Sequence, residues 1–279
     1  MGKNTAITWT DHSWNPWQGC HKVSTACDNC YMYREKKRYG QDPGTVVRSS
    51  NKTFNQPLRW WEPAKVFTCS WSDFFIEEAD EWRFWAWYII MKTPHLTYQI
   101  LTKRPERIKD CLPKDWGNGW PNVWLGVTAE NQEMADLRVP ILLQIPAAVR
   151  FVSVEPMLGP VDLDSYLVVG ADYPWSIMCK GIDWVICGGE SGPRARPMHP
   201  DWVRSLRAQC QVVGVPFFFK QWGEWKGNYP GDNWKPTNDM KFYYFDTPGY
   251  LGKVWKCGTK AAGHLLDAQE WRQFPEGSR

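Results

Sequence analysis

Short apolar runs recur along the chain and predict six β-strands. They are rich in β-branched and aromatic residues, and both faces of each run are apolar, which is typical of buried parallel strands. Amphipathic stretches lie between them and predict helices over residues 76–91, 104–111, 131–143 and 200–213. The predicted strands cover residues 65–70, 97–102, 122–128, 149–154, 183–187 and 215–220.

The alternation of strand and helix predicts an α/β fold, in the form of a full or partial parallel (β/α) barrel. After Trp222 the pattern changes to Gly, Pro, Trp and Tyr with short alternating runs, such as residues 241–245. We therefore expect the barrel over residues 1–222 and a β-rich C-terminal appendage over residues 223–279. A chain of 279 residues is long enough for one large domain or two small ones.

Polar residues follow each predicted strand. In parallel barrels the carboxyl ends of the strands carry the site, so these residues are the first candidates for ligand binding. The same carboxylates can instead form salt bridges with Lys103, Arg104 or Lys220, and the sequence leaves both interpretations open. The candidates are Ser72, Asp73, Glu130, Ser153, Glu155, Gly188, Gly189 and Glu190.

Composition and charge limit the classes of function. The chain has 33 basic and 30 acidic residues, and its net charge of +3 excludes a protein that binds nucleic acid through bulk charge. Twenty tryptophans are the unusual feature, so any contact with nucleic acid uses local patches and aromatic faces. The longest apolar run, residues 84–91, is far short of the ~20 residues that span a bilayer. We expect a soluble, cytoplasmic protein without a membrane partner.

The cysteines carry the strongest chemical signal. Nine cysteines without an export signal favour metal ligation over a disulfide framework. Cys20, Cys27 and Cys30 follow the spacing Cys-x6-Cys-x2-Cys, so three thiolates can reach one metal centre. A structural zinc ion needs a fourth ligand, for which His12, His21 and Cys69 are the candidates. An iron–sulfur cluster with three cysteines keeps one iron open for a cofactor or substrate, and we favour the cluster.

The segment that carries these cysteines, Trp14-Asn-Pro-Trp-Gln-Gly-Cys20 followed by Cys27-Asp-Asn-Cys30-Tyr31, resembles a phage-associated three-Cys-motif family. That family is itself similar to radical S-adenosylmethionine (SAM) enzymes. The resemblance covers nearly the whole chain. Further matching segments are residues 70–75, 101–107, 126–131, 153–158, 188–192, 218–223 and 258–267.

The resemblance implies a radical SAM enzyme. Cys20, Cys27 and Cys30 would hold a [4Fe-4S] cluster that cleaves SAM to a 5′-deoxyadenosyl radical, once a partner reductant supplies an electron. The phage setting implies action in the host cytoplasm on a nucleobase or on a modification attached to one, such as an isomerisation in DNA hypermodification. The alternative is a non-catalytic zinc protein that binds nucleic acid.

Two departures from standard radical SAM enzymes leave the SAM contacts open. The first cysteine gap is six residues instead of three, and the aromatic Tyr31 follows the last cysteine instead of preceding it. A Gly-Gly-Glu segment normally ends the second strand of these enzymes, but here Gly188-Gly189-Glu190 ends the sixth and Asp73 follows the second. Either Asp73 or Glu190 is therefore expected to hold the SAM amino group, while Glu130, Ser153 or Glu155 suits the ribose.

A basic segment follows the cysteine loop. Arg34, Lys36, Lys37 and Arg38 lie on a predicted helix and are candidate contacts for the phosphates of a nucleic acid, although a solvated helix face shows the same pattern. In the appendage, tryptophans either stack on bases or pack a small β core. They are Trp222, Trp225, Trp234 and Trp255.

Overall fold

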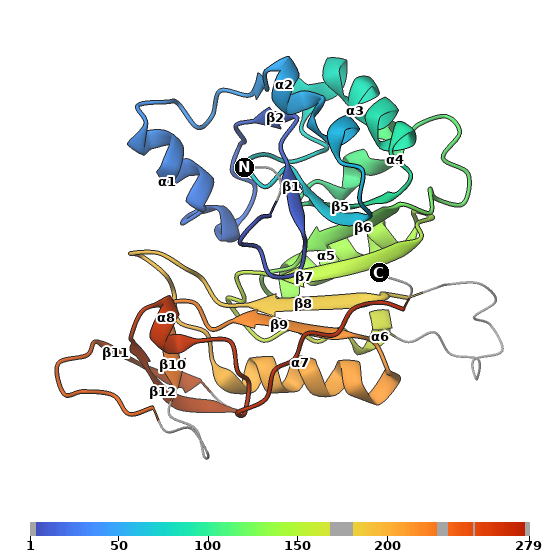
Figure 1. The fold of residues 1–279 in the computed structure, drawn as a ribbon. Helices are drawn as coiled ribbons and strands as arrows, with labels where there is room; N and C mark the ends of the chain where they lie inside the picture. Colours follow the sequence, from blue (N-terminus) through green and yellow to red (C-terminus); the bar gives the residue numbers. More distant parts are fainter. Residues whose placement is uncertain (1–3, 168–180, 228–233, 248, 277–279) are drawn as a thin grey trace. The chain divides into compact units, whose positions relative to one another are not determined.

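A computed structural model describes residues 4–167, 181–227, 234–247 and 249–276 (Figure 1). Seven strands form one sheet in the order β1-β4-β5-β6-β7-β8-β9. The pairs β1-β4, β4-β5, β5-β6 and β8-β9 are parallel. The strands are β1 (His12–Trp14), β4 (Ala64–Thr68), β5 (Leu96–Thr102), β6 (Val123–Thr128), β7 (Val149–Val154), β8 (Trp184–Gly188) and β9 (Phe217–Gln221).

The six predicted strands are confirmed, and the sheet has a seventh strand that the sequence did not predict. This strand, β1, pairs in parallel with β4, with His12 opposite Val66. It has only three residues, too few to show a recognisable hydrophobic pattern. The strand order runs from β1 to β9 without closing, which agrees with the partial form of the predicted parallel barrel.

The four predicted helices are also confirmed. Residues 76–91 form a 3₁₀ turn, η3 (Glu77–Ala79), which leads into α3 (Asp80–Lys92). The helix α7 (Pro200–Val213) begins with proline, whose fixed φ suits a first turn, and ends at Gly214 with φ of 74°. The other helical elements are η1 (Thr25–Cys27), α1 (Tyr31–Arg38), α2 (Asn51–Phe54), η2 (Gln56–Arg59), η4 (Pro105–Arg107), α4 (Ile108–Cys111), α5 (Gln132–Leu143), α6 (Asp164–Leu167) and α8 (Thr259–Ala262).

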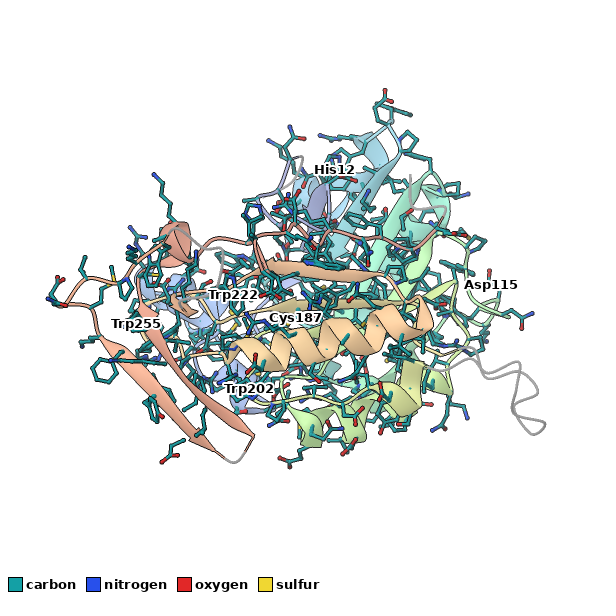
Figure 2. All side chains as sticks on the ribbon, turned by 90° about the horizontal axis from the view of Figure 1, so that it is seen from below. His12, Asp115, Cys187, Trp202, Trp222 and Trp255 are labelled. Atoms are coloured by element: carbon teal, nitrogen blue, oxygen red, sulfur yellow. The ribbon has the colours of Figure 1, made fainter. Side chains whose placement is uncertain are left out.

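The C-terminal part is β-rich, as predicted. A three-stranded antiparallel sheet has the order β10-β12-β11, with β10 (Trp225–Gly227), β11 (Phe242–Thr247) and β12 (Tyr250–Lys256). Trp222, at 1% exposure, belongs to the core (Figure 2).

A separate antiparallel pair joins β2 (Trp17–Gln18) to β3 (Val47–Arg48).

Contacts between residues divide the chain into two units. Unit 1 contains residues 1–128, 137–151 and 277–279, and unit 2 contains residues 129–136 and 152–276. This grouping says nothing about independent folding, so the predicted boundary after residue 222 stays a prediction. Among the described residues, no helix combines the length and the apolar character that crossing a membrane requires.

Candidate metal centre

The Trp-Asn-Pro-Trp segment ties the cysteine loop to the carboxyl end of β4 in unit 1. Trp14 and Trp17 are fully buried, and the Trp17 indole donates a hydrogen bond of 3.0 Å to the Asp73 carbonyl. The side chain of Asn15 accepts from the Trp71 amide at 2.8 Å and donates to the Ser70 hydroxyl at 3.0 Å. These residues fix where the loop starts, and that role accounts for their pattern before Cys20.

The backbone around Cys20 is held equally firmly. Gly19 has φ of 99°, and a Cβ there would lie 2.2 Å from the Thr45 carbonyl oxygen, so only glycine fits. Its amide donates to the Trp71 carbonyl at 3.0 Å, and its own carbonyl accepts from the Ser72 hydroxyl. Ser72, a predicted cofactor contact, therefore acts in this structure by holding the loop.

The three cysteines of the motif gather around one phenol. Cys27 ends η1, and Cys30 directly precedes α1, whose third residue is Tyr33. The Tyr33 hydroxyl donates to the Cys20 carbonyl. Burial, together with the neighbouring Cys20, Cys27 and Cys30, raises the pKa of Tyr33 to about 12. The three sulfurs that raise the pKa of this hydroxyl therefore lie at the same end of unit 1.

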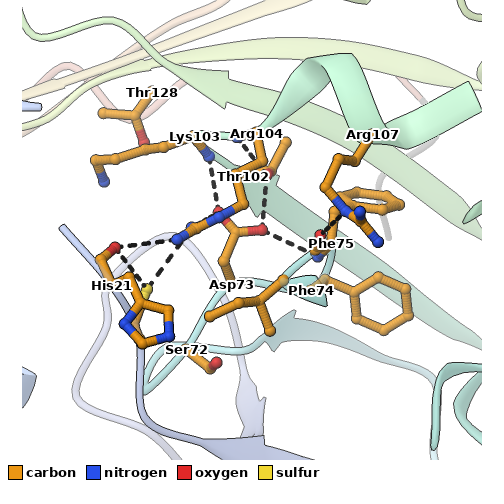
Figure 3. A network of polar contacts seen from close by, with 12 residues as sticks. His21, Ser72, Asp73, Phe74, Phe75, Thr102, Lys103, Arg104, Arg107 and Thr128 are labelled. Carbon is orange, nitrogen blue, oxygen red and sulfur yellow. Dashed lines mark hydrogen bonds and ion pairs between the residues drawn. The ribbon is translucent and has the colours of Figure 1, made fainter. Parts of the chain in front are cut away.

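Arg104 connects this cysteine loop with the ends of β4 and β5 (Figure 3). Its guanidinium lies 3.7 Å from the Cys20 sulfur and donates to the His21 carbonyl at 3.0 Å. The same group lies 3.3 Å from the Asp73 carboxylate, and both side chains are almost completely buried. A buried cation next to a buried anion is the arrangement that a low-dielectric site requires.

The Asp73 carboxylate is fully occupied by protein donors. One oxygen accepts from the Phe75 amide at 2.9 Å and from the Thr102 hydroxyl at 2.7 Å. The other accepts from the Lys103 amide at 2.9 Å and pairs with Arg104. Asp73 thus joins the two strand ends, and the Ser72-Asp73 corner has a structural role that does not need a ligand.

Burial also controls the chemistry of Cys20. It raises the pKa of the Cys20 thiol to about 11, and Asp73 adds to the increase while Arg104 opposes it. The thiol is therefore protonated at neutral pH in the free chain. A metal bound as a thiolate complex must displace that proton.

The three candidates for a fourth zinc ligand lie in other contacts. His12 stacks on Trp60, with ring centroids 4.7 Å apart, and His21 pairs with Glu78. Cys69 is buried, and its backbone φ is 64°. Burial raises the pKa of its thiol well above the ordinary value. Within the described ranges, no three His, Cys, Asp or Glu side chains are grouped closely enough to hold a single metal ion.

Unit 2 has its own pair of opposite charges after β8, a buried carboxylate with a half-buried arginine. Glu190, a candidate for the SAM amino group, accepts three hydrogen bonds from Arg196. Two come from the side chain and one from the backbone amide. The sequence did not predict the role of Arg196, because a spacing of six residues from Glu190 does not indicate a pair.

Other groups at the strand ends of unit 2 remain available for a ligand. Glu155 pairs with Lys220 at 3.1 Å, as one of the two sequence interpretations expected. A Cβ on Gly188 would lie 2.5 Å from a Glu155 carboxylate oxygen, so the glycine makes room for that side chain. The Ser153 hydroxyl, two residues earlier on the same strand face, is fully buried and has no hydrogen-bond partner.

The remaining predicted cofactor contacts in unit 2 are buried. Glu130 is fully buried, and its backbone carbonyl accepts from the Leu158 amide at 2.7 Å. A Cβ on Gly189 would lie 2.0 Å from the Trp222 carbonyl oxygen, so close backbone packing alone accounts for this glycine. Unit 2 thus keeps Ser153 and Glu155 as its best candidates for binding ligand hydroxyls.

The basic segment lies on α1, as predicted, but its four cations differ in exposure. Arg34, Lys37 and Arg38 are exposed, whereas Lys36 is 3% exposed, and burial lowers its pKa. Glu35 lies 3.6 Å from Arg34 and 4.0 Å from Arg38, so part of the positive charge is balanced within the helix. Three cations therefore remain in a position to meet phosphates.

A cavity of about 740 Å³ lies elsewhere in unit 1, between α3 and the segment that follows α4. Trp87 and Trp120 line it together with Arg83, Arg107 and Cys111. The two arginines already donate to Asp80, at 2.5 and 2.7 Å. The cavity contains none of the residues that the sequence singled out, so it is not part of the candidate site.

These features define an α/β protein with an open parallel sheet and a three-cysteine loop anchored at its strand ends. The chain belongs to the family described as "Protein of unknown function (DUF5131)", whose model matches residues 4–275. No curated protein and no solved structure gives a significant match. Membership of this family assigns no activity, so the radical SAM resemblance stays a prediction.

Proposed function

We propose that the chain is a radical SAM enzyme. Cys20, Cys27 and Cys30 hold its [4Fe-4S] cluster, and the substrate is a nucleobase or a modification attached to one. The observation that carries the proposal is the anchoring of the three-cysteine loop: the Tyr33 hydroxyl donates to the Cys20 carbonyl, and the Arg104 guanidinium of the Arg104–Asp73 pair lies 3.7 Å from the Cys20 sulfur.

The donor set suits a cluster better than a single ion. A zinc ion needs its ligands gathered around one point, with sulfurs about 2.3 Å from the metal. In a cluster each cysteine binds a different iron, so the three sulfurs stand around a larger body. Cys20, Cys27 and Cys30 lie within eleven residues of one loop, and the Arg104 guanidinium lies 3.7 Å from the Cys20 sulfur, so this loop offers three thiols beside a cation.

The surrounding residues fit a negatively charged group. The Arg104 guanidinium, 3.7 Å from the Cys20 sulfur, offsets the charge that three thiolates bring to a buried position. Asp73 and the His21 carbonyl keep that guanidinium in place. When bound, a reduced cluster of this type supplies the electron that cleaves SAM, and a partner protein must provide that electron.

Groups for the rest of SAM are found among the predicted candidates. Glu155 can accept hydrogen bonds from ribose hydroxyls, and the buried Ser153 hydroxyl still lacks a partner. Asp73 and Glu190 are already occupied by Arg104 and Arg196. Glu155 shares its carboxylate with Lys220, so we assign a SAM contact to Ser153 first and keep Glu155 as a second candidate for the ribose.

The nucleic-acid part of the proposal depends on α1. Arg34, Lys37 and Arg38 are exposed on the helix that starts directly after Cys30. Phosphate contacts make the affinity for a polynucleotide fall with salt, by a log–log slope of about 0.7 to 0.9 for each phosphate neutralised. Replacing Lys37 and Arg38 with Gln should lower the magnitude of that slope by about 1.4 to 1.8, as expected for the loss of two phosphate contacts. Lys92→Gln, on α3, is the control and should leave it unchanged.

Metal analysis of anaerobically purified protein tests the cluster. The proposal predicts a brown protein with broad absorption near ~400 nm and roughly four irons per chain. In Cys27→Ala the iron should be lost, while Cys210→Ala, a buried cysteine of α7, should keep it. A colourless protein with one zinc, or full iron retention in Cys27→Ala, contradicts the proposal.

A further inference from the structure

The two faces of the C-terminal sheet differ in what covers them. On one face Phe245 is buried against His199 and Trp202, with ring centroids 4.8 and 5.3 Å away. A Cβ on Gly252, directly opposite Phe245, would lie 2.9 Å from the His199 ring. The start of α7 therefore covers this face around Phe245 and Gly252.

The other face carries a row of aromatic side chains. Phe242 and Tyr244 alternate with Phe245 along β11, and both are more than half exposed, at 58% and 56%. Trp255 of β12 lies directly opposite Phe242 in the register, and Trp234 packs on it with ring centroids 6.2 Å apart. Alternate residues of a strand lie about 7 Å apart, close to the length of one nucleotide in an extended strand.

Lysines are interleaved with these rings. Lys253 lies opposite Tyr244, and its ammonium is 3.6 Å from the centre of the Phe242 ring and 5.3 Å from that of Trp255. Lys226 of β10 lies opposite Trp255, with its ammonium 5.6 Å from the Trp234 ring. Each aromatic surface on this face therefore has a cation beside it.

This combination selects among partners. An apolar protein surface would have to bury the Lys253 ammonium, which is costly unless the partner supplies an anion. A single-stranded nucleic acid offers both complements, because its bases stack on aromatic faces and its phosphates pair with lysines. Base stacking is stronger than an exposed cation–π contact, so a base can displace an ammonium towards the neighbouring phosphate. The carboxylate on this face, Asp246, lies opposite Leu251, away from the Phe242–Trp255 pair.

We propose that this face binds single-stranded nucleic acid, with bases on Phe242, Tyr244 and Trp255 and phosphates at Lys226 and Lys253. The inference goes beyond the proposed radical chemistry. It assigns a surface in unit 2, whereas the cysteines and α1 belong to unit 1, and it needs neither cluster nor SAM.

Fluorescence anisotropy with labelled dT15 and rU15 at low salt tests it on the full chain, without SAM or reductant. Phe242→Ala and Trp255→Ala should each weaken binding about tenfold, in line with the loss of one stacked base. Phe242→Tyr, which keeps the ring, should bind like the wild type. Phe84→Ala removes an aromatic from α3 in unit 1 that is even more exposed than Phe242, at 67%, and it should also leave the affinity unchanged.

Salt dependence separates the charge from the stacking. Lys226→Gln and Lys253→Gln should each lower the log–log salt slope by about 0.7, whereas the ring variants should leave it unchanged. Thermal unfolding monitored by circular dichroism checks that each variant is folded. Undetectable binding of both oligomers, or equal losses in Phe242→Ala and Phe84→Ala, would overturn the inference. Neither result would affect the cluster, because the iron content is measured separately.

Discussion

Two strand-end regions of the molecule contain the same kinds of residue and use them differently. In unit 1, at the ends of β4 and β5, the Asp73 carboxylate has four protein partners, including the buried Arg104. In unit 2, at the ends of β7 and β9, Glu155 has Lys220, and the nearby Ser153 hydroxyl is buried without a partner. The first region is complete in itself, whereas the second has hydrogen-bonding capacity left.

The difference shows how little a carboxylate at a strand end says about ligand binding. Asp73 and Glu190 follow strands as a cofactor carboxylate would, but an arginine neutralises each of them. The Ser153 hydroxyl, by contrast, is buried without a hydrogen-bond partner. Position and charge alone therefore do not identify which of these groups binds a ligand.

Removing Asp73 should have the largest effect on stability. Asp73→Ala leaves Arg104 buried without its counter-charge, which costs about 3–5 kcal/mol for a pair of this kind. Urea denaturation of the metal-free chain measures the loss. Lys22→Ala breaks an exposed pair with Asp28, at 3.6 Å, and should cost no more than about 0.5 kcal/mol. Equal losses in the two variants would show that the Asp73 network is not structural.

Glu190→Ala should cost less, about 2 kcal/mol, in the same experiment. Its partner Arg196 is 31% exposed, so the guanidinium keeps water after the carboxylate is lost, whereas Arg104 is 10% exposed. Glu190→Gln keeps one oxygen acceptor and should fall between the wild type and the alanine variant. A loss as large as that of Asp73→Ala would remove the distinction between the two arginine pairs.

Ser153→Ala should have the smallest effect on stability and a clear effect on SAM binding. Because the hydroxyl has no partner, its removal should leave the free energy of unfolding unchanged or raise it by up to about 1 kcal/mol. Calorimetry with reconstituted protein should show about tenfold weaker SAM binding, equivalent to ~1.4 kcal/mol. Unchanged affinity would show that Ser153 is not a SAM contact.

Much of the fold was predictable because buried parallel strands carry a simple pattern. The six runs of apolar residues from 65–70 to 215–220 correspond to β4 to β9, within about two residues at each end. The short β1 has no such pattern, since its three residues gain their place through the parallel pairing with β4. The local sequence of a strand does not indicate a pairing partner that lies about fifty residues away.

The candidate site was predictable in its cysteines and less so in its polar partners. The short spacing of Cys20, Cys27 and Cys30 limits how far they can separate, so their proximity follows from the chain itself. The pairing of Glu190 with Arg196, and the burial of Lys36 within the basic segment, depend on tertiary packing. The sequence shows charged residues at these positions but does not indicate their partners.

The formation of 5′-deoxyadenosine tests the central claim most directly. Reconstituted protein is reduced anaerobically with SAM present, and the product is measured by mass spectrometry for the wild type, Cys27→Ala and Cys210→Ala. The account predicts 5′-deoxyadenosine from the wild type and from Cys210→Ala, and none above background from Cys27→Ala. No 5′-deoxyadenosine from an iron-loaded wild type, or equal amounts from Cys27→Ala, would contradict the assignment of this chain as a radical SAM enzyme.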